Sequence, residues 1–419
     1  MKRKVLALLM VTAMGCSLLG GCGSEQETSE RGISAKEKVD DGIVDLKVWA
    51  DADSQALVEE LIAGFTAKYG SEAKFNITYE AQGEADCRDV LLGDLKAAAD
   101  VFCFADDQLN SMLAGGALSP VPNASEVAAA NTAESVEASS YKGTLYAYPM
   151  TADNGYFMYY NKNYFTEEDV QTFDGMLAVC AANGKKMTMD LSSGWYLYSF
   201  FGQTGMEMKL NPDGVTNFCN WNESGVVAGA DVAQAILDIC KHPGFKSGGD
   251  ADLIAGANDD TVIAGVSGVW NAMAIKEAWG DDYGAVKLPT YTVAGQQLQM
   301  ASFTGFKMVG VNAYSEEVEW AHKFADYMTN EDSQNLRFAM RNQGPSNIKA
   351  AASEEVSKVP AILAVIDQSQ YGTLQRVGNS YWGACTEFTD VLVAGNPQGK
   401  TMQELMDVLV NGITLSVAQ

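Results

Sequence analysis

The chain after residue 42 alternates strand patterns with amphipathic helix patterns. Apolar and polar residues alternate from Ile43 to Ala50 with the period of two expected of a half-buried strand. Residues 74–80 repeat this alternation, and the apolar run at 100–105 is typical of a buried parallel strand. Helix patterns at 54–69 and 85–98 connect the three runs. This β-α-β-α-β order predicts a parallel sheet with right-handed crossovers.

The stretch Tyr141–Lys162 interrupts this order, and we interpret it as a hinge. Two strand-like runs, 145–148 and 155–160, are separated by a break that begins at Pro149 and contains Asp153. Such a break predicts a chain that crosses from one sheet to another, with a ligand cleft beside it. The pattern alone fits an ordinary β-ribbon inside one domain equally well.

Strand and helix patterns continue from the hinge to the end of the chain. Strands are predicted at 186–191, 262–266, 284–288 and 303–312. Helices are predicted at 226–240, 270–279, 316–328, 332–340, 352–367, 380–394 and 402–415. The 419 residues are enough for two or three domains of this α/β class.

Aromatic and acidic residues follow each of the first three predicted strands. Ligands of open α/β sheets bind outside the carboxyl ends of the strands, so a ligand is expected here. A single Asp after a strand is most often a helix cap, and the argument therefore depends on all three ends together. The residues are Trp49, Asp51 and Asp53, then Glu80 and Gln82, then Phe104, Asp106 and Asp107.

The N-terminus has the pattern of a secretory signal. Lys2-Arg3-Lys4 precede an apolar run at 5–14, and the small residues of Leu19-Gly20-Gly21 stand directly before Cys22. Residues 19–22 resemble a bacterial lipobox, in which the cysteine becomes the lipidated first residue of the mature protein. The resemblance implies a lipoprotein signal peptide at 1–21 and lipidation at Cys22; a plain signal peptide cleaved nearby is the alternative. Residues 22–40 are polar and lack periodicity, which predicts a flexible tether with a reach of about 20–25 Å.

The charge balance limits the classes of partner. The net charge of the chain is −26, and removing the signal peptide with its three basic residues gives 25 − 54 = −29. This charge repels nucleic acid and favours a neutral or cationic ligand. We therefore expect no nucleic-acid partner.

Motifs for metal, cofactor or nucleophile chemistry do not occur in the sequence. The two histidines, His242 and His322, have no neighbouring ligands at zinc spacing, so no metal or cofactor is expected. The six cysteines after Cys22 are scattered, and we expect buried free thiols rather than disulfides. Composition does not exclude a pair of glycosidase carboxylates. Aromatic residues near strand ends and helix starts can cover the faces of a sugar whose hydroxyls donate to carboxylates.

Several segments resemble the solute-binding proteins of bacterial carbohydrate ABC importers, and most of all the maltose/maltodextrin-binding proteins. YKGTLYAYPMTADNGYFMYYNK is similar to the crossover segment of that family, and LKVWADAD and DVFCFADDQLNSMLAGGAL to its first and third strands with their loops. VSGVW and NSYWGA resemble two tryptophan-bearing elements. The resemblance covers nearly all of the chain after about Ile43.

The resemblance implies a two-lobed periplasmic-binding-protein-like α/β fold with a hinge and an interlobe ligand cleft. It implies an N-terminal lobe of residues 41–151 and 303–345 and a C-terminal lobe of residues 152–302 and 346–419. The interlobe crossings would lie near Thr151–Asn154, Met300–Phe303 and Gly344–Asn347. The implied substrate-binding residues are Trp49, Asp53, Phe104, Asp107, Asp153, Trp195, Tyr196, Trp270 and Trp382.

Some positions depart from the family pattern. Ser54 stands where Lys is common, Gln108 where Arg is common, and Ser193 where Glu is common. These departures affect the choice of sugar more than the class of ligand.

The resemblance implies a lipid-anchored, extracytoplasmic, monomeric protein that is not an enzyme. It would capture an oligosaccharide, of maltose or maltodextrin type, and deliver it to the permease subunits of an ABC importer at the cell membrane. The alternatives are a secreted glycoside hydrolase and a binder of another small solute, such as a polyamine or a metal.

Overall fold

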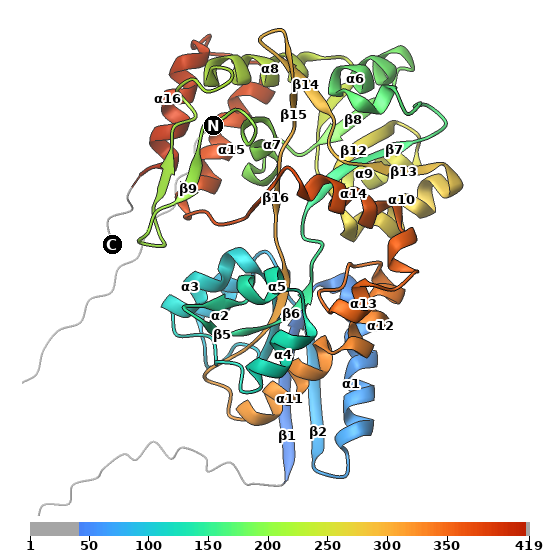
Figure 1. Cartoon of the computed structure of the whole chain (residues 1–419), viewed down its shortest axis with the longest axis vertical. Helices are drawn as coiled ribbons and strands as arrows, with labels where there is room; N and C mark the ends of the chain where they lie inside the picture. The colour runs from blue at the N-terminus through green and yellow to red at the C-terminus, as the bar shows by residue number, and fades with distance from the viewer. Residues whose placement is uncertain (1–41, 416–419) are drawn as a thin grey trace, which may run out of the picture. The chain divides into compact units, whose positions relative to one another are not determined.

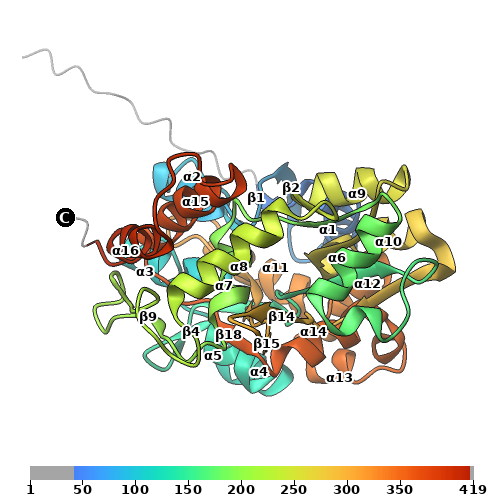
Figure 2. The same ribbon diagram turned by 90° about the horizontal axis from the view of Figure 1, so that it is seen from above.

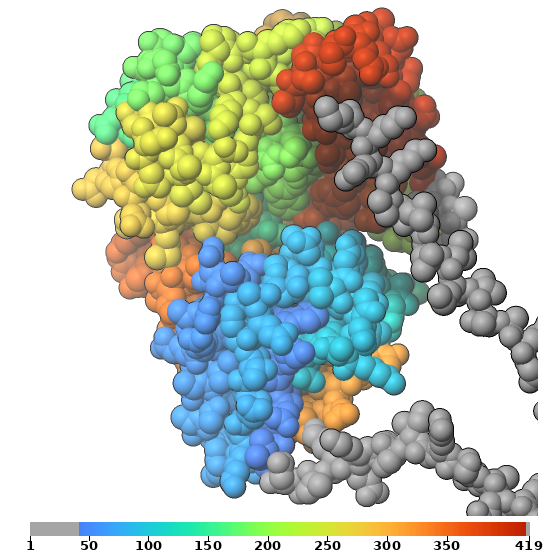
Figure 3. All heavy atoms as spheres, turned by 180° about the vertical axis from the view of Figure 1, so that it is seen from behind, coloured from blue at the N-terminus to red at the C-terminus, as the bar shows by residue number. Residues whose placement is uncertain are grey.

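The computed structural model describes residues 42–415, which form two five-stranded sheets with helices packed on them (Figure 1). The predicted signal peptide, Cys22 and the tether lie outside the described residues. We refer to each five-stranded sheet with its helices as the first and the second lobe. In the space-filling view, the blue and cyan residues of the first lobe and the green and yellow residues of the second form separate masses (Figure 3).

The first sheet has the strand order β2-β1-β3-β17-β6. β1 pairs in parallel with both β2 and β3, as the sequence pattern predicts, whereas β17 is antiparallel to both β3 and β6. A segment from late in the chain is therefore inserted between two strands from its first half. The strands are β1 (Ile43–Ala50), β2 (Lys74–Ala81), β3 (Val101–Ala105), β6 (Ala147–Thr151) and β17 (Lys307–Val311).

Both faces of the first sheet are covered. Val44, Leu46 and Val48 of β1 pack in one hydrophobic cluster with α1 and α11, while Trp49 packs on the opposite face with Phe104. This alternation follows from the period of two along a strand. The helices of the first lobe are α1 (Gln55–Tyr69), α2 (Cys87–Gly93), α3 (Leu109–Ala114), α4 (Ala124–Ala130), α5 (Ala133–Ala138), α11 (Val318–Thr329) and α12 (Glu331–Arg341).

The second sheet has the strand order β11-β8-β12-β7-β13. β8 is parallel to β11 and β12, and β7 is antiparallel to β12 and β13. Trp221, which is fully buried and stacked on Phe201 at 4.2 Å, lies within the largest hydrophobic cluster of this lobe. The strands are β7 (Tyr156–Asn161), β8 (Lys186–Met189), β11 (Phe245–Ser247), β12 (Val262–Gly268) and β13 (Tyr283–Val286).

The helices of the second lobe gather in two groups. α15 and α16 pack on each other at one side, away from α9 and α10 (Figure 2). The helices are α6 (Phe173–Ala182), α7 (Gly194–Phe201), α8 (Gly229–Lys241), α9 (Asp250–Asn258), α10 (Ala272–Trp279), α14 (Pro360–Ser369), α15 (Ser380–Val393) and α16 (Met402–Ile413); the short α13 (Ile348–Ala351) follows α12.

The chain passes between the two sheets at the predicted hinge. β6 belongs to the first sheet and β7 to the second, so residues 152–155 connect the lobes. A bridge joins Thr151 to Pro345, where the chain leaves α12 for the second lobe. A third connection is β16 (Ser302–Thr304), which pairs with β18 (Gly372–Leu374) in a two-stranded sheet that we call the β16–β18 ribbon.

The predicted break at Pro149 is wrong. β6 continues through Pro149 to Thr151, and the break follows at residue 152. β6 is an edge strand and its pairing with β17 shifts register beside Pro149, so the missing N–H of proline costs no regular ladder bond. A turn lies at Lys142-Gly143, where both residues have positive φ between the short strands β4 (Ser140–Tyr141) and β5 (Thr144–Leu145).

Two predicted helices differ in extent. The helix predicted at 85–98 ends at Gly93, because the Asp94 carboxylate accepts the N–H groups of Lys96 and Ala97 in a separate turn. The helix predicted at 352–367 begins at Pro360, a residue suited to the first position of a helix.

The six cysteines of the described residues are free, as expected. Five are buried and Cys240 is partly buried. Burial raises the pKa of all six thiols above the usual value.

Trp221→Ala should lower the free energy of unfolding by about 3–5 kcal/mol, because it leaves a cavity in the second lobe. Urea unfolding followed by circular dichroism measures this loss. Val226→Ala is the control, since Val226 is 60% exposed and should change stability by less than about 0.5 kcal/mol. Equal losses in the two variants would contradict the packing described here.

Candidate functional site

A cavity of about 860 Å³ is lined by side chains from both lobes. Its volume lies within the range of small-molecule binding sites. The first lobe contributes residues that follow β1, β2 and β3, which are the strand ends where a ligand is expected. The charged and aromatic lining residues are Asp51, Asp53, Asp86, Arg88, Asp89, Asp107, Trp195, Trp270, Lys307, Arg341 and Trp382.

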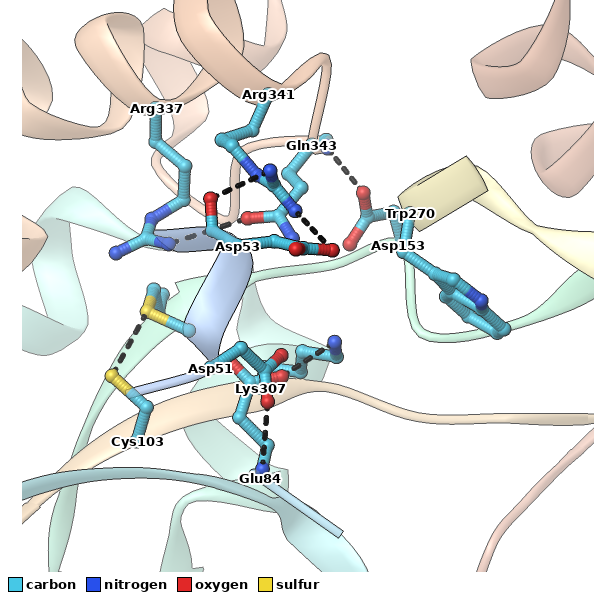
Figure 4. A network of polar contacts seen from close by, with 12 residues as sticks. Asp51, Asp53, Glu84, Cys103, Asp153, Trp270, Lys307, Arg337, Arg341 and Gln343 are labelled. Atoms are coloured by element: carbon cyan, nitrogen blue, oxygen red, sulfur yellow. Dashed lines mark hydrogen bonds and ion pairs between the residues drawn. The ribbon is translucent and has the colours of Figure 1, made fainter. Parts of the chain in front are cut away.

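An ion pair lies beneath the cavity in the first lobe. Lys307, the first residue of β17, places its Nζ 2.5 Å from Oε2 of Glu84 (Figure 4). Their side chains are only 12% and 5% exposed, so each charge depends on the other for compensation. The Glu84 N–H in turn donates to Oδ1 of Asp51 at 3.0 Å, which connects the pair to the end of β1.

These contacts shift the pKa values of Glu84 and Asp51. Burial by itself would raise the pKa of Glu84, but the charge and hydrogen bond of Lys307 hold that pKa below its usual value. Burial raises the pKa of Asp51 to about 6, and the neighbouring Glu84 adds to the rise. The cavity floor therefore contains one fixed ion pair and one carboxyl that titrates close to neutrality.

A second group of polar residues comes from the end of α12. Arg341 donates to the backbone oxygen of Asp53 at 2.7 Å, and its Nη2 lies 3.8 Å from the Asp53 carboxylate. Arg337, 2% exposed, donates to Gln343, which lines the cavity. α12 thereby fixes the loop after β1 from the side (Figure 4).

Three tryptophans of the second lobe face the cavity, each held by a neighbour. Trp270 donates its indole N–H to Oδ2 of Asp250 at 2.8 Å, and Nζ of Lys307 lies 5.6 Å from its ring centroid. Trp195 is stacked on Phe303 at 5.5 Å, and Trp382 packs edge-on against Tyr381. All three are partly exposed, so they offer apolar surface to a ligand.

The structure brings five of the nine predicted binding residues to the cavity wall and places the other four elsewhere. Those at the wall are Asp53, Asp107, Trp195, Trp270 and Trp382. Trp49 and Phe104 are buried between the first sheet and its helices, because they point to the opposite face of the strands from the residues under α1. Tyr196 is 7% exposed and packs against Tyr156.

Asp153 is the fourth residue outside the wall. It is 5% exposed, and its Oδ2 accepts the N–H of Gly344. Burial raises the pKa of this carboxyl. Asp153 thus joins two crossings of the hinge, and the next residue, Asn154, is the one that lines the cavity.

Sequence reasoning missed the basic residues of the site. Lys307 and Arg341 lie beside carboxylates that are more than 200 positions away in the chain, so no local spacing predicts these pairs. Lys307 as a charged residue opening an apolar strand was the available signal. Gln343 and Gln375 also line the cavity and carried no signal.

Within residues 42–415 no group of three or more His, Cys, Asp or Glu side chains could hold a metal ion. In the same range no helix is both long and apolar enough to cross a membrane.

Comparisons with known proteins agree with this architecture. The model of the family described as bacterial extracellular solute-binding protein matches residues 60–364. A galactooligosaccharide-binding protein of Bacillus subtilis (strain 168) is 24% identical over 387 residues, which are 88% of this chain and 87% of the relative. A maltooligosaccharide ABC transporter solute-binding lipoprotein of Streptococcus pneumoniae (strain ATCC BAA-255 / R6) is 24% identical over 386 residues, 87% of this chain and 86% of the relative.

Two solved structures have the same fold. One, determined with acarbose, has a TM-score of 0.79 at 28% identity and covers 89% of this chain and 99% of its own. The other is the maltodextrin binding protein MalE1 from L. casei BL23 without ligand, with a TM-score of 0.74, 24% identity and the same coverage. The likeness confirms the two-lobed fold.

Asp51→Asn should stabilise the protein at about pH 8, by roughly 1–3 kcal/mol, and change its stability little at about pH 4. The pKa of Asp51 is raised from 3.8 to about 6 in the folded chain, so wild-type stability falls as pH rises from about 4 to 6 and this loss persists above. Urea unfolding at both pH values measures the difference. A stability change of the same size at both would show that ionisation of Asp51 is not its cause.

Proposed function

Because the chain belongs to the bacterial extracellular solute-binding protein family, we propose that it captures an oligosaccharide for an ABC sugar importer. One observation supports this above all: three partly exposed tryptophans and several carboxylates line the same cavity. Aromatic rings cover the C–H faces of sugar rings, and carboxylates accept hydrogen bonds from hydroxyls. A neutral sugar is compatible with an acidic cavity in a chain of net charge −26.

The proposed ligand is an α-glucan fragment of maltose or maltodextrin type. The names of the relatives and of the matched structures support an oligosaccharide. Gln108, at a position where the family often has Arg, lines the cavity and is fixed by hydrogen bonds to Glu84 and Arg88. A neutral amide here favours an uncharged ligand.

In the proposed mechanism, the ligand stabilises a closed arrangement of the two lobes. Contacts with Asp53 and Asp107 come from the first lobe, and contacts with Trp195, Trp270 and Trp382 come from the second. Only a closed state offers both sets, so binding shifts the population toward it. Bending would occur at the three crossings that separate residues 41–151 and 303–345 from residues 152–302 and 346–419. No catalytic step is required.

The remaining predicted residues are assigned supporting roles. Trp49, Phe104 and Tyr196 lie behind the wall and hold its shape, and Asp153 fixes the hinge through Gly344. Cys22 would carry the lipid, and the tether of residues 22–40 would let a monomer reach the permease subunits on the outer face of the cell membrane.

Trp270→Ala and Trp382→Ala should each weaken binding of maltotriose by roughly thirtyfold, or about 2 kcal/mol, because each removes a stacking surface. Isothermal titration calorimetry measures the affinity. Phe218→Ala is the matched control: this ring is 40% exposed and outside the cavity wall, so its loss should leave affinity unchanged. Unaltered binding by both tryptophan variants would refute the proposal.

Two assays of the wild-type protein distinguish the proposed function from the alternatives, a glycoside hydrolase and a binder of another small solute. Incubation with maltodextrins should yield no shortened products, whereas a glycoside hydrolase would release them. Calorimetric titration with a polyamine and with divalent cations should give no heat of specific binding.

Cys22→Ser should move the protein from the membrane fraction to the medium or periplasm, because it removes the site of lipid attachment. Immunoblotting of cell fractions measures the distribution. A serine variant that stays with the membrane would contradict lipidation at Cys22.

A further inference from the structure

Arg376 joins the two lobes beside the cavity. It follows the β16–β18 ribbon, and its guanidinium reaches into the first lobe. Nη1 donates to the backbone oxygen of Asp106 at 2.6 Å and to its Oδ2 at 2.7 Å, and Nη2 donates to the backbone oxygen of Ala138 at 3.2 Å. Arg376 thus fixes the end of β3 through bonds to both the backbone and the side chain of one residue.

Asp106 depends on this cation. Its side chain is fully buried, and its other oxygen, Oδ1, accepts the N–H of Phe306 at 3.0 Å. Burial raises the pKa of Asp106 to about 6, and the charge of Arg376 limits the rise. A buried carboxylate of this kind is strongly destabilising once its partner is removed.

Asp107, the next residue, is the acid that faces the cavity. Its Oδ1 is buried and has no hydrogen-bond partner within the described residues, so it has a free lone pair for a hydrogen bond donated by a ligand hydroxyl. Three charged groups act on it: Asp106 beside it in the chain, Arg376 from the second lobe, and Arg88 of α2, which is itself paired with Asp89 at 2.7 Å. Burial and Asp106 raise the pKa of Asp107 to about 7, while Arg376 and then Arg88 oppose the rise.

We propose that Arg376 is a positioning residue for ligand capture, which holds the end of β3 and brings a positive charge from the second lobe to the adjacent Asp107, so that capture depends on pH. This inference rests on the proposed function, because it takes a sugar hydroxyl to donate to Asp107. Arg376 does not touch the ligand in this scheme; it acts through Asp106 and Asp107.

The direction of the pH dependence follows from the acceptor role. A hydroxyl that donates to Asp107 stabilises the carboxylate and lowers its pKa in the complex. Affinity is then full at pH values above about 7, the pKa of Asp107 in the empty cavity, and falls as pH drops below it. The fall is at most about tenfold per pH unit, because one proton is involved.

The test is the affinity for maltotriose measured by calorimetry from about pH 5 to pH 9. Wild type should weaken below about pH 7, and Asp107→Asn should lose this fall at pH values above the pKa of Asp51, which is about 6. Arg376→Gln removes the cation that opposes the rise in the pKa of Asp107, so its fall in affinity should begin at higher pH than in wild type. Arg376→Lys should restore the wild-type midpoint, because it keeps the charge, but bind more weakly at every pH, because it loses the forked hydrogen bonds.

Two controls keep the test decisive. Arg341→Lys makes the same substitution on the other side of the cavity and should leave the midpoint unchanged. If Arg376→Gln does not fold, Asp106→Asn combined with Arg376→Gln replaces the buried ion pair with two amides, and its midpoint should lie at higher pH than that of Asp106→Asn alone.

The outcomes separate the inference from the proposed function. Absence of maltotriose binding by wild type at any pH would refute the proposed function. Binding that is flat with pH in wild type, or a midpoint that is identical in wild type and Arg376→Gln, would overturn the inference while leaving the proposed function intact.

Discussion

The ion pair between Lys307 and Glu84 is the interaction on which the cavity depends. Both groups are nearly inaccessible to water, and a buried charge without a partner is far more costly than one that is paired. Lys307 is the first residue of β17, the strand that enters the first sheet between β3 and β6. The strand that completes the first sheet therefore also carries the charge that neutralises Glu84 at the cavity floor. The cation that pairs with Glu84 is carried by the segment that returns from the second lobe.

The two lobes contribute different chemistry to the cavity. Carboxylates come mainly from strand ends of the first lobe, and indole rings come from helix starts of the second. Each ring is oriented by a neighbour behind it, such as Asp250 for Trp270 and Phe303 for Trp195. This division means that neither lobe alone presents both the carboxylates and the indole rings. In the proposed function, selectivity for the ligand and closure of the lobes would therefore be linked.

Local periodicity predicted the elements of the fold well where the pattern is long. The bounds of β1 match the predicted strand, and the family resemblance predicted from the crossover segment is confirmed by the family match. The pattern at 303–312 predicts one strand, but the structure has two, β16 and β17. They are separated at Gly305-Phe306, where the Asp106 carboxylate packs and accepts the N–H of Phe306. Contacts of this kind join residues about 200 positions apart, and no window of sequence contains both partners.

The residues of the candidate site were likewise predictable only in part from the sequence. Three tryptophans predicted from the resemblance lie at the wall, but Trp49 and Phe104 do not, because the face of a strand on which a ring lies depends on which helices cover the sheet. The cations Lys307, Arg341 and Arg376 could not be predicted from spacing, since each is defined by a distant carboxylate.

Burial of the free cysteines determines how readily their thiols react. Their raised pKa values leave almost no thiolate at neutral pH, and thiolate is the form that oxidises and exchanges. In the folded state the six thiols of residues 42–415 are therefore poor partners for oxidants and for disulfide exchange.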